Sequence, residues 1–336
     1  MKIDMKNWVS SIIESGLRKV MPVMTYPGLA LINKNIMDVI TDGQNQFECI
    51  KALAEKYPSA AAVTIMDLSV EAEAFGSTIK FSEDEVPAVT NAIVTNEDQA
   101  VALQIPKVGA GRTGVYIEAA KLCAQNIIDK PTFGGIIGPF SLAGRLMDMT
   151  EIMVQILIDP ELSHIVVSKC TEFLIEYAKA FKAVGANGII IAEPAAGLIS
   201  PDLCSAFSSV YVKKIVDAVQ DDNFLVILHN CGNTVNLVPS MLSTGARAFH
   251  FGNAVDMLDI LPQIPENILA FGNVEPAGVF RNGSAENMKA VTSALLEKTA
   301  KYKNYVLSSG CDVPPHTPLE NVDAFYSTLV EFNKKK

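Results

Sequence analysis

Short apolar runs alternate with longer amphipathic stretches along most of the chain. Eight of these runs contain six or seven residues each, and most are apolar throughout. Parallel strands that are buried on both faces have this pattern, whereas strands with one exposed face alternate apolar and polar residues. The pattern therefore predicts eight parallel strands, at residues 20–26, 60–66, 132–138, 188–193, 224–230, 247–252, 268–273 and 305–310.

The stretches between these runs are predicted to form helices. The longest covers residues 161–184, where Phe173, Tyr177 and Phe181 fall on one apolar stripe and Gly185 ends the helix. Further helices are predicted to begin at Ser200, Ser284 and Pro318, and near Thr113 after a polar insertion at residues 76–95.

This alternation predicts a single α/β domain over residues 1–336, a (β/α)8 TIM barrel to which residues 1–19 add an extra N-terminal helix. No linker or low-complexity stretch divides the chain. The chemistry of such barrels lies at the carboxyl ends of the strands. In this chain the strand ends carry polar and metal-ligating side chains, namely Asp67, Glu193, His229, Cys231, Asn253, Asn273 and Cys311.

Three of these residues have the composition of a zinc site. His229 and Cys231 end the fifth predicted strand, and residues two apart share one face of a strand, so both can point into the mouth of the barrel. Cys311 ends the eighth strand, at the same edge. One imidazole and two sulfurs are zinc ligands, and three protein ligands leave the fourth position open, as in catalytic zinc sites. Core packing explains any one of the three alone; their coincidence at strand ends favours a metal.

Further candidates lie near the expected metal. Glu193 ends the fourth strand, and we interpret it as a zinc ligand displaced by substrate, a partner of His229, or an acid in the pocket. His250 lies inside the sixth strand and faces either the pocket or the core, and His316 follows two prolines in a loop over the mouth. We predict that the catalytic and metal-binding residues are Glu193, His229, Cys231 and Cys311, and that the residues around the cofactor are Asp67, His250, Asn273 and His316.

A GxGxxG pattern at Gly109–Gly114 matches the dinucleotide-binding motif, which requires a buried strand before it. Pro106 and Lys107 precede it instead, and proline is excluded from central strands. We interpret this segment as a loop that enters a helix.

Composition narrows the classes of partner and the compartment. The formal net charge is −10, with no cluster of Lys and Arg beyond Lys334–Lys336, so nucleic acid and anionic membranes are not expected partners. Neither a signal peptide nor an apolar run of the roughly 20 residues that a membrane span needs is found. The six cysteines are widely scattered, which favours a reducing, cytoplasmic location over a disulfide framework.

The ligand charges indicate what such a zinc ion would do. Two thiolates cancel its charge, so the ion activates water poorly, but it still binds an incoming thiol as the thiolate. A bound thiolate is a nucleophile for alkyl carbon, so the ligand set favours alkyl transfer to a thiol over hydrolysis.

Five segments, 66–76, 138–144, 191–194, 229–233 and 310–321, resemble the uroporphyrinogen decarboxylase superfamily, and more narrowly its zinc-dependent methylcobalamin:coenzyme M methyltransferases. The His-x-Cys pattern with a distant cysteine is the specific part of this resemblance. The resemblance implies a TIM barrel, with zinc bound by His229, Cys231 and Cys311 and an acidic residue, Glu193, near the metal. It also implies that a small corrinoid protein carries methylcobalamin and that the methyl group passes from it to a small thiol.

The chain also departs from the family's patterns. Residues 21–28 lack the arginines that bind the acidic porphyrin in the decarboxylases. The sulfonate of coenzyme M calls for a positive group, and Arg112 and Arg145 are candidates, while another thiol or tetrahydrofolate stays open as the acceptor. Two alternatives remain: a decarboxylase of a tetrapyrrole or similar acid, and a non-catalytic corrinoid-binding protein with structural zinc.

Overall fold

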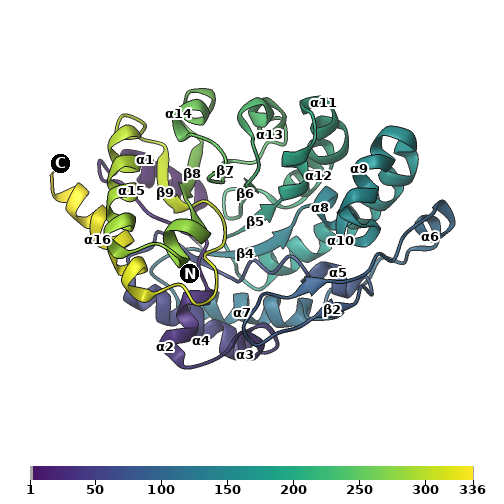
Figure 1. Cartoon of the computed structure of the whole chain (residues 1–336), viewed down its shortest axis with the longest axis horizontal. Helices are drawn as coiled ribbons and strands as arrows, with labels where there is room; N and C mark the ends of the chain where they lie inside the picture. Colours follow the sequence, from purple (N-terminus) through teal and green to yellow (C-terminus); the bar gives the residue numbers. More distant parts are fainter. Residues whose placement is uncertain (1–2, 336) are drawn as a thin grey trace.

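The computed structural model describes residues 3–335, and within them seven parallel strands form one curled sheet in the order β1-β4-β5-β6-β7-β8-β9 (Figure 1). The strands are β1 (Ala62–Val63), β4 (Thr132–Ile137), β5 (Gly188–Ala192), β6 (Leu225–Asn230), β7 (Ala248–Phe251), β8 (Leu269–Val274) and β9 (Tyr305–Ser309). Each lies within or overlaps a predicted run, so seven of the eight predicted strands are confirmed.

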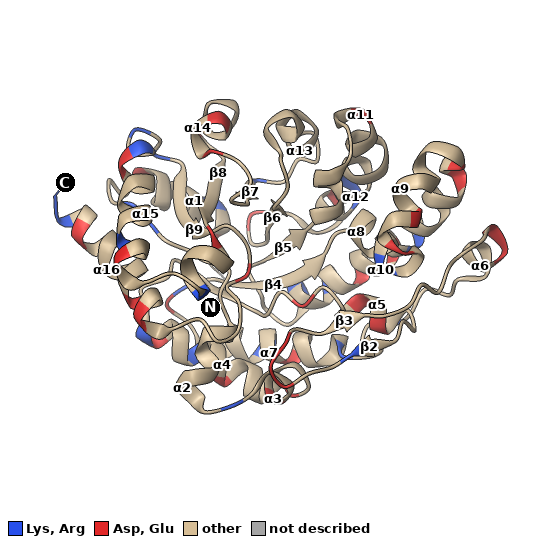
Figure 2. Ribbon diagram, viewed as in Figure 1, with Lys and Arg blue, Asp and Glu red and all other residues tan. Residues whose placement is uncertain are grey.

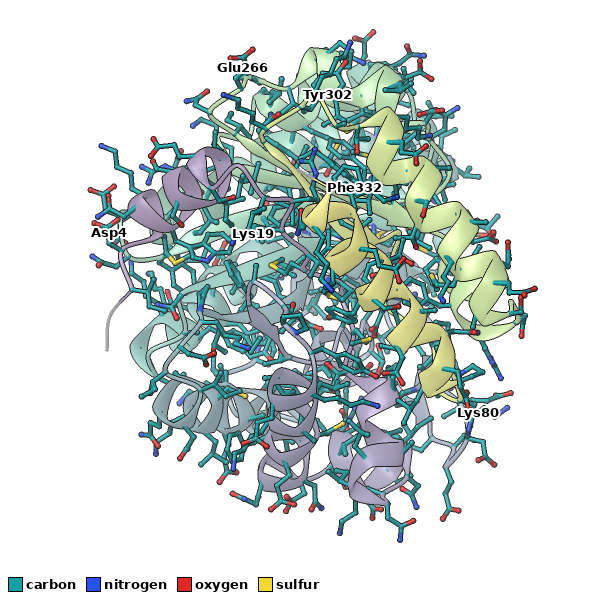
Figure 3. The ribbon with its side chains drawn as sticks, turned by 90° about the vertical axis from the view of Figure 1, so that its left-hand side faces the viewer. Asp4, Lys19, Lys80, Glu266, Tyr302 and Phe332 are labelled. Carbon is teal, nitrogen blue, oxygen red and sulfur yellow. The ribbon has the colours of Figure 1, made fainter. Side chains whose placement is uncertain are left out.

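The first predicted run is extended but forms no regular strand. Residues 19–25 lie between the two edges of the sheet: the backbone N–H of Met21 donates to the Leu307 carbonyl at 2.9 Å, and that of Ala60 donates to Val20 at 2.8 Å. Only the Val20–Leu307 pair forms a bridge. Pro22 has no N–H to give to a ladder, which accounts for the irregular backbone. Figure 3 shows Lys19 at the start of this segment, between α1 (Met5–Glu14) and α16 (Leu319–Lys334).

Helices cover the outer face of the sheet (Figure 1). The other long ones are α4 (Gly43–Lys56), α7 (Thr113–Asn126), α8 (Pro139–Met147), α9 (Met149–Ile158), α10 (Pro160–Ala183), α12 (Val210–Val219) and α15 (Ala285–Lys298). The short ones are α2 (Leu29–Ile32), α3 (Ile36–Ile40), α5 (Val70–Ala74), α6 (Glu97–Ala102), α11 (Pro201–Cys204), α13 (Val238–Leu242) and α14 (Met257–Ile260). The predicted polar insertion carries the antiparallel pair β2 (Ile79–Lys80) and β3 (Ala88–Val89).

The predicted long helix and the predicted loop before α7 are confirmed, and the prediction for residues 1–19 is only partly covered. Helix α10 occupies the predicted range within one residue at each end, and Gly109–Arg112 form a loop that leads into α7 at Thr113 rather than the turn of a dinucleotide site. Helix α1 lies inside the range 1–19 and is capped by Asp4, whose carboxylate accepts from the N–H of Asn7. Residues 1–2 of that range lie outside the described part of the chain.

The alternation of side chains along the strands divides the core in two. Inside the curl, one cluster contains Ile190, Ala192, Leu225, Ile227, Ala248, Leu269, Phe271 and Val306, together with Met5 and Ile12 of α1. The strand residues between them, such as Ile189, Ile191 and Val226, face the helices and join the larger outer cluster. This parity decides which residue at each strand end points to the centre.

Lys, Arg, Asp and Glu residues are interspersed over the helices and loops, and the strands are almost free of them (Figure 2). Among the helices of the described chain, none combines the length and hydropathy that crossing a membrane requires.

Candidate metal centre

His229, Cys231 and Cys311 converge at the carboxyl end of the sheet. Their ligand atoms, one ring nitrogen and two sulfurs, all lie within 4.8 Å of one another. His229 is the fifth residue of β6, Cys231 follows that strand, and Cys311 comes two residues after β9. The predicted meeting of these three side chains is therefore present in the structure, although they are separated by up to 82 positions in the sequence.

Small residues and one amide hold the backbone around the cysteines. A Cβ on Gly252, after β7, would overlap the Cα of Cys231, so only glycine lets the two strand ends approach this closely. Asn230 fixes the turn between them: its Oδ1 accepts from the N–H of Gly232 at 2.8 Å, and its Nδ2 donates to the Glu193 carbonyl at 2.7 Å. The sulfur of Cys231 is thereby held at the rim.

The two thiols have opposite tendencies to ionise. The Cys311 thiol, followed by the His229 ring, lowers the pKa of Cys231 to about 4. The same contact with Cys231, together with burial, raises the pKa of Cys311 well above its ordinary value. The pair thus holds one thiolate at neutral pH, and binding a metal ion through both sulfurs requires the second proton to leave.

His229 presents an unused ring nitrogen to these sulfurs. Its Nδ1 lies 2.7 Å from Nδ1 of His250, on the paired strand β7. Its Nε2 is buried, and no hydrogen-bond partner for it exists among residues 3–335. Buried ring nitrogens are nearly always satisfied, so an unsatisfied one beside two sulfurs has the character of a metal ligand.

The structure does not bring Glu193 into the group formed by His229, Cys231 and Cys311. Residues 190 and 192 of β5 face the centre, so Glu193 falls on the opposite parity and turns towards α8. Its carboxylate accepts from the N–H groups of Phe140 and Ser141 at 2.9 and 2.8 Å and from Ser208 Oγ at 3.0 Å. These two N–H groups belong to the first turn of α8, which has no partners for them within the helix. Glu193 therefore caps a helix, and Ala192 takes the place beside His229.

Asp67 lines the cavity at the strand ends, and its carboxylate is already engaged. Oδ2 accepts from Arg112 Nη1 at 2.5 Å and from Tyr116 Oη at 2.9 Å, while Oδ1 accepts from Ser69. Arg112 also pairs with Glu73 at 2.6 Å. The guanidinium of Arg112 is therefore committed to these carboxylates rather than free to bind an anion.

The other expected cofactor residues have different surroundings. His250 contacts His229 and is fully buried, so it lies behind the metal ligand rather than in the open pocket. Asn273 donates from Nδ2 to the carbonyls of Gly252 and Val255 at 2.9 and 2.8 Å and so holds the loop after β7. His316 is exposed beside Asp84. Among these three side chains, none lines the cavity at the strand ends.

A cavity of about 510 Å³ opens at the strand ends. Charged and polar residues on its wall are Tyr26, Asp67, Asp84, Glu85, Arg145, Arg281 and Asp312. Asp312 directly follows the ligand candidate Cys311, and its Oδ1, like Tyr26 Oη, has no hydrogen-bond partner among the described residues. Arg145 was a candidate from the sequence, whereas Tyr26, Arg281 and Asp312 were not recognised.

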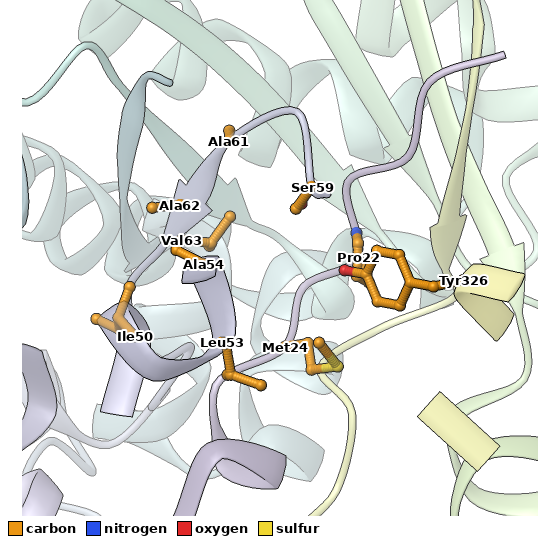
Figure 4. A pocket seen from close by; sticks show the side chains of 10 residues that line it. All are labelled: Pro22, Met24, Ile50, Leu53, Ala54, Ser59, Ala61, Ala62, Val63 and Tyr326. Atoms are coloured by element: carbon orange, nitrogen blue, oxygen red, sulfur yellow. The ribbon is translucent and has the colours of Figure 1, made fainter. Parts of the chain in front are cut away.

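A second cavity, between residues 22–24, α4, β1 and Tyr326 of α16, measures about 20 Å³ (Figure 4). Its lining is mostly apolar, and its volume admits about one water molecule. This cavity is too small for a substrate, whereas the 510 Å³ cavity beside Asp312 has room for one.

Known proteins resemble the chain over nearly its whole length. The profile of the uroporphyrinogen decarboxylase (URO-D) family matches residues 17–332. The methylcobamide:CoM methyltransferase MtbA of Methanosarcina acetivorans is 30% identical over 269 residues, which are 76% of this chain and 75% of that protein. The uroporphyrinogen decarboxylase of Alcanivorax borkumensis is 24% identical over 312 residues, 90% of this chain and 87% of the relative.

Solved structures agree with the fold. A methyltransferase from Methanosarcina mazei superposes with a TM-score of 0.86 at 24% identity, covering 98% of this chain and 99% of its own. A B12-independent methionine synthase from Shewanella sp. W3-18-1 superposes with a TM-score of 0.62 at 12% identity, over 95% and 98% of the two chains. With a family match that spans almost every described element, the chain belongs to the uroporphyrinogen decarboxylase (URO-D) family.

Proposed function

We propose that this protein is a zinc-dependent methyltransferase that moves a methyl group from a methyl-corrinoid, carried by a small partner protein, to a thiol. One observation carries the proposal: an unsatisfied, buried Nε2 of His229 meets the sulfurs of Cys231 and Cys311 at the carboxyl ends of the strands. The relatives named methylcobamide:CoM methyltransferase and methylated-thiol–coenzyme M methyltransferase support the reaction class.

The donor set suits an ion that binds sulfur and keeps one position for substrate. His229, Cys231 and Cys311 would hold zinc, and the remaining carboxylate candidate, Glu193, is occupied with α8. When bound, zinc supplies a Lewis acid that lowers the pKa of an acceptor thiol from about 8.5 and keeps it as the thiolate. The thiolate sulfur would then accept the methyl group, and the electron pair of the broken cobalt–carbon bond would stay with the corrinoid of the partner protein as cob(I)alamin, with the methylated thiol as the other product.

The chain's own residues would bind and orient the acceptor. Arg145 and Arg281 line the cavity beside Asp312, and they offer two guanidinium groups to an anionic substituent such as the sulfonate of coenzyme M. Arg112 is excluded from this role because Asp67 and Glu73 already pair with it. We therefore propose a small thiol with an acidic group as the acceptor.

We propose that residues 19–25 take the place of the eighth strand, because hydrogen bonds join this segment to Leu307 on one side and to Ala60 on the other. The curled sheet is then a (β/α)8 barrel, and α1 is its added helix. All six cysteines are free thiols in the structure, which supports a reducing, cytoplasmic setting.

Methyl transfer can be followed directly. Zinc-loaded protein mixed with methylcobalamin and coenzyme M, or with other small anionic thiols, is expected to produce cob(I)alamin, seen by its absorbance under anaerobic conditions, and protein freed of zinc is expected to be inactive. No turnover of the zinc-loaded protein with any such thiol, or release of CO₂ from uroporphyrinogen by the zinc-free protein, would contradict the proposal.

A further inference from the structure

A chain of hydrogen bonds runs from the candidate metal ligand His229 to a backbone carbonyl. His229 Nδ1 lies 2.7 Å from His250 Nδ1, His250 Nε2 lies 2.8 Å from Ser308 Oγ, and Ser308 Oγ lies 2.7 Å from the Met21 carbonyl oxygen. His250 and Ser308 are fully buried, and each lies on the inner face of its strand. No other part of the proposed chemistry uses these two side chains.

The carbonyl at the end fixes the direction of every bond in the chain. The Met21 oxygen can only accept, so Ser308 uses its single hydroxyl proton there. Ser308 Oγ must then accept from His250, which places a proton on His250 Nε2. A neutral His250 consequently has a lone pair on Nδ1, and the contact with His229 is a hydrogen bond only if His229 Nδ1 carries the proton.

A charged His250 would donate to His229 Nδ1 instead of accepting from it, but the surroundings of His250 do not favour a cation. The ring is fully buried, and its hydrogen-bond partners are the Ser308 hydroxyl, a second imidazole and the backbone of Ser309, with no carboxylate among the described residues bonded to it. An unpaired buried charge is strongly unfavourable. The neutral form, with the proton on Nε2, therefore remains.

We propose that His250 and Ser308 are positioning residues that keep the proton of His229 on Nδ1, so that Nε2 is always the atom with a free lone pair facing Cys231 and Cys311. This role rests on the proposed zinc site. Metal-binding histidines usually donate their second N–H to a carboxylate or a carbonyl, which fixes the tautomer and the ring orientation. Here the imidazole of His250 accepts that N–H instead of a carboxylate or carbonyl. The orientation of His250 is fixed in turn by the Ser308 hydroxyl, which donates to the Met21 carbonyl.

Two pairs of variants test the role through zinc affinity, measured by competition with a chromophoric chelator. His250→Leu removes the acceptor and is expected to weaken zinc binding about 10- to 100-fold, the usual effect of losing such a partner. His250→Asn keeps an oxygen near the position of Nδ1 and is expected to restore affinity to within a few-fold of wild type. Ser308→Ala is expected to weaken binding about 10-fold.

Ser309→Ala is the matched control. Ser309 is equally buried on β9 and contacts the same segment through Val23, but its side-chain hydroxyl is hydrogen-bonded to Val23 rather than to an imidazole. Its zinc affinity is expected to equal that of wild type. Equal affinities in Ser308→Ala, His250→Leu and Ser309→Ala would overturn the role of the chain while leaving the zinc site in place, whereas failure of the wild-type protein to bind zinc would overturn the proposed function as well.

Nitrogen-15 NMR of the imidazole rings gives a readout that altered packing alone would not produce. In wild-type protein, His229 is expected to carry its proton on Nδ1 and His250 on Nε2, and in Ser308→Ala the fixed tautomer of His250 is expected to be lost while the folded spectrum is kept. A proton on Nδ1 of His250 in the wild-type protein would overturn the proposal.

Discussion

Serine at position 231 or 311 is expected to weaken zinc binding by at least about a hundred-fold. Apparent zinc-binding free energies of about 10–16 kcal/mol are shared among four ligands, so one ligand accounts for roughly 3 kcal/mol or more. Serine is nearly the same size as cysteine, but its hydroxyl is a poor zinc ligand at neutral pH. Methyl transfer to the thiol is expected to fall with zinc occupancy, to the level of the zinc-free protein.

Metal analysis after gel filtration and the cob(I)alamin assay would measure both effects. Cys204→Ser is the matched control, because Cys204 is buried in α11 next to Ser209 and lies outside the three-residue group. Its zinc content and activity are expected to match wild type. If Cys231→Ser retained full zinc content at limiting zinc, the assignment of the ligands would be wrong.

Replacing Glu193 by alanine is expected to lower the free energy of unfolding by on the order of 3 kcal/mol while leaving zinc affinity within a few-fold of wild type. The carboxylate is the partner of two N–H groups at the start of α8 and of Ser208 Oγ, and all three are buried. Alanine leaves them unsatisfied and removes the negative charge from the helix N-terminus.

Urea unfolding and chelator competition on the same variant separate a structural role from a ligand role. Glu193→Gln keeps one acceptor oxygen and is expected to lose less stability than Glu193→Ala, with zinc affinity again little changed. The opposite pattern, unchanged stability with lost zinc binding, would show that Glu193 is a zinc ligand.

Glu193 and His229 show that strand patterns predict where a strand ends but not which face of the strand points to the centre. Both residues end buried strands, and sequence position alone makes them equivalent. The parity of β5 separates them: Ile190 and Ala192 are the residues facing the centre, so residue 193 faces the helices. In β6 the inward residues are Leu225 and Ile227, which places His229 at the centre as predicted. Knowing the inward face of each strand would have identified Glu193 as a helix cap.

Other parts of the site depend on contacts between distant segments, which the sequence pattern does not contain. His250 is a buried strand histidine in any reading; only the register of β6 with β7 places it against His229. The cavity wall includes Arg281 and Asp312 because the segments after β8 and β9 fold over the strand ends, and loop paths are weakly encoded by periodicity. The irregular first strand follows from Pro22, a local signal that was visible but outweighed by the apolar run.

X-ray absorption at the zinc edge tests the central claim most directly, because it counts the sulfur neighbours of the bound ion. We expect two sulfurs and one imidazole nitrogen from the chain in the resting protein, with one light atom from solvent, and a third sulfur after the acceptor thiol is added. A sulfur count that stays at two in the presence of a saturating, turnover-competent thiol would contradict this expectation.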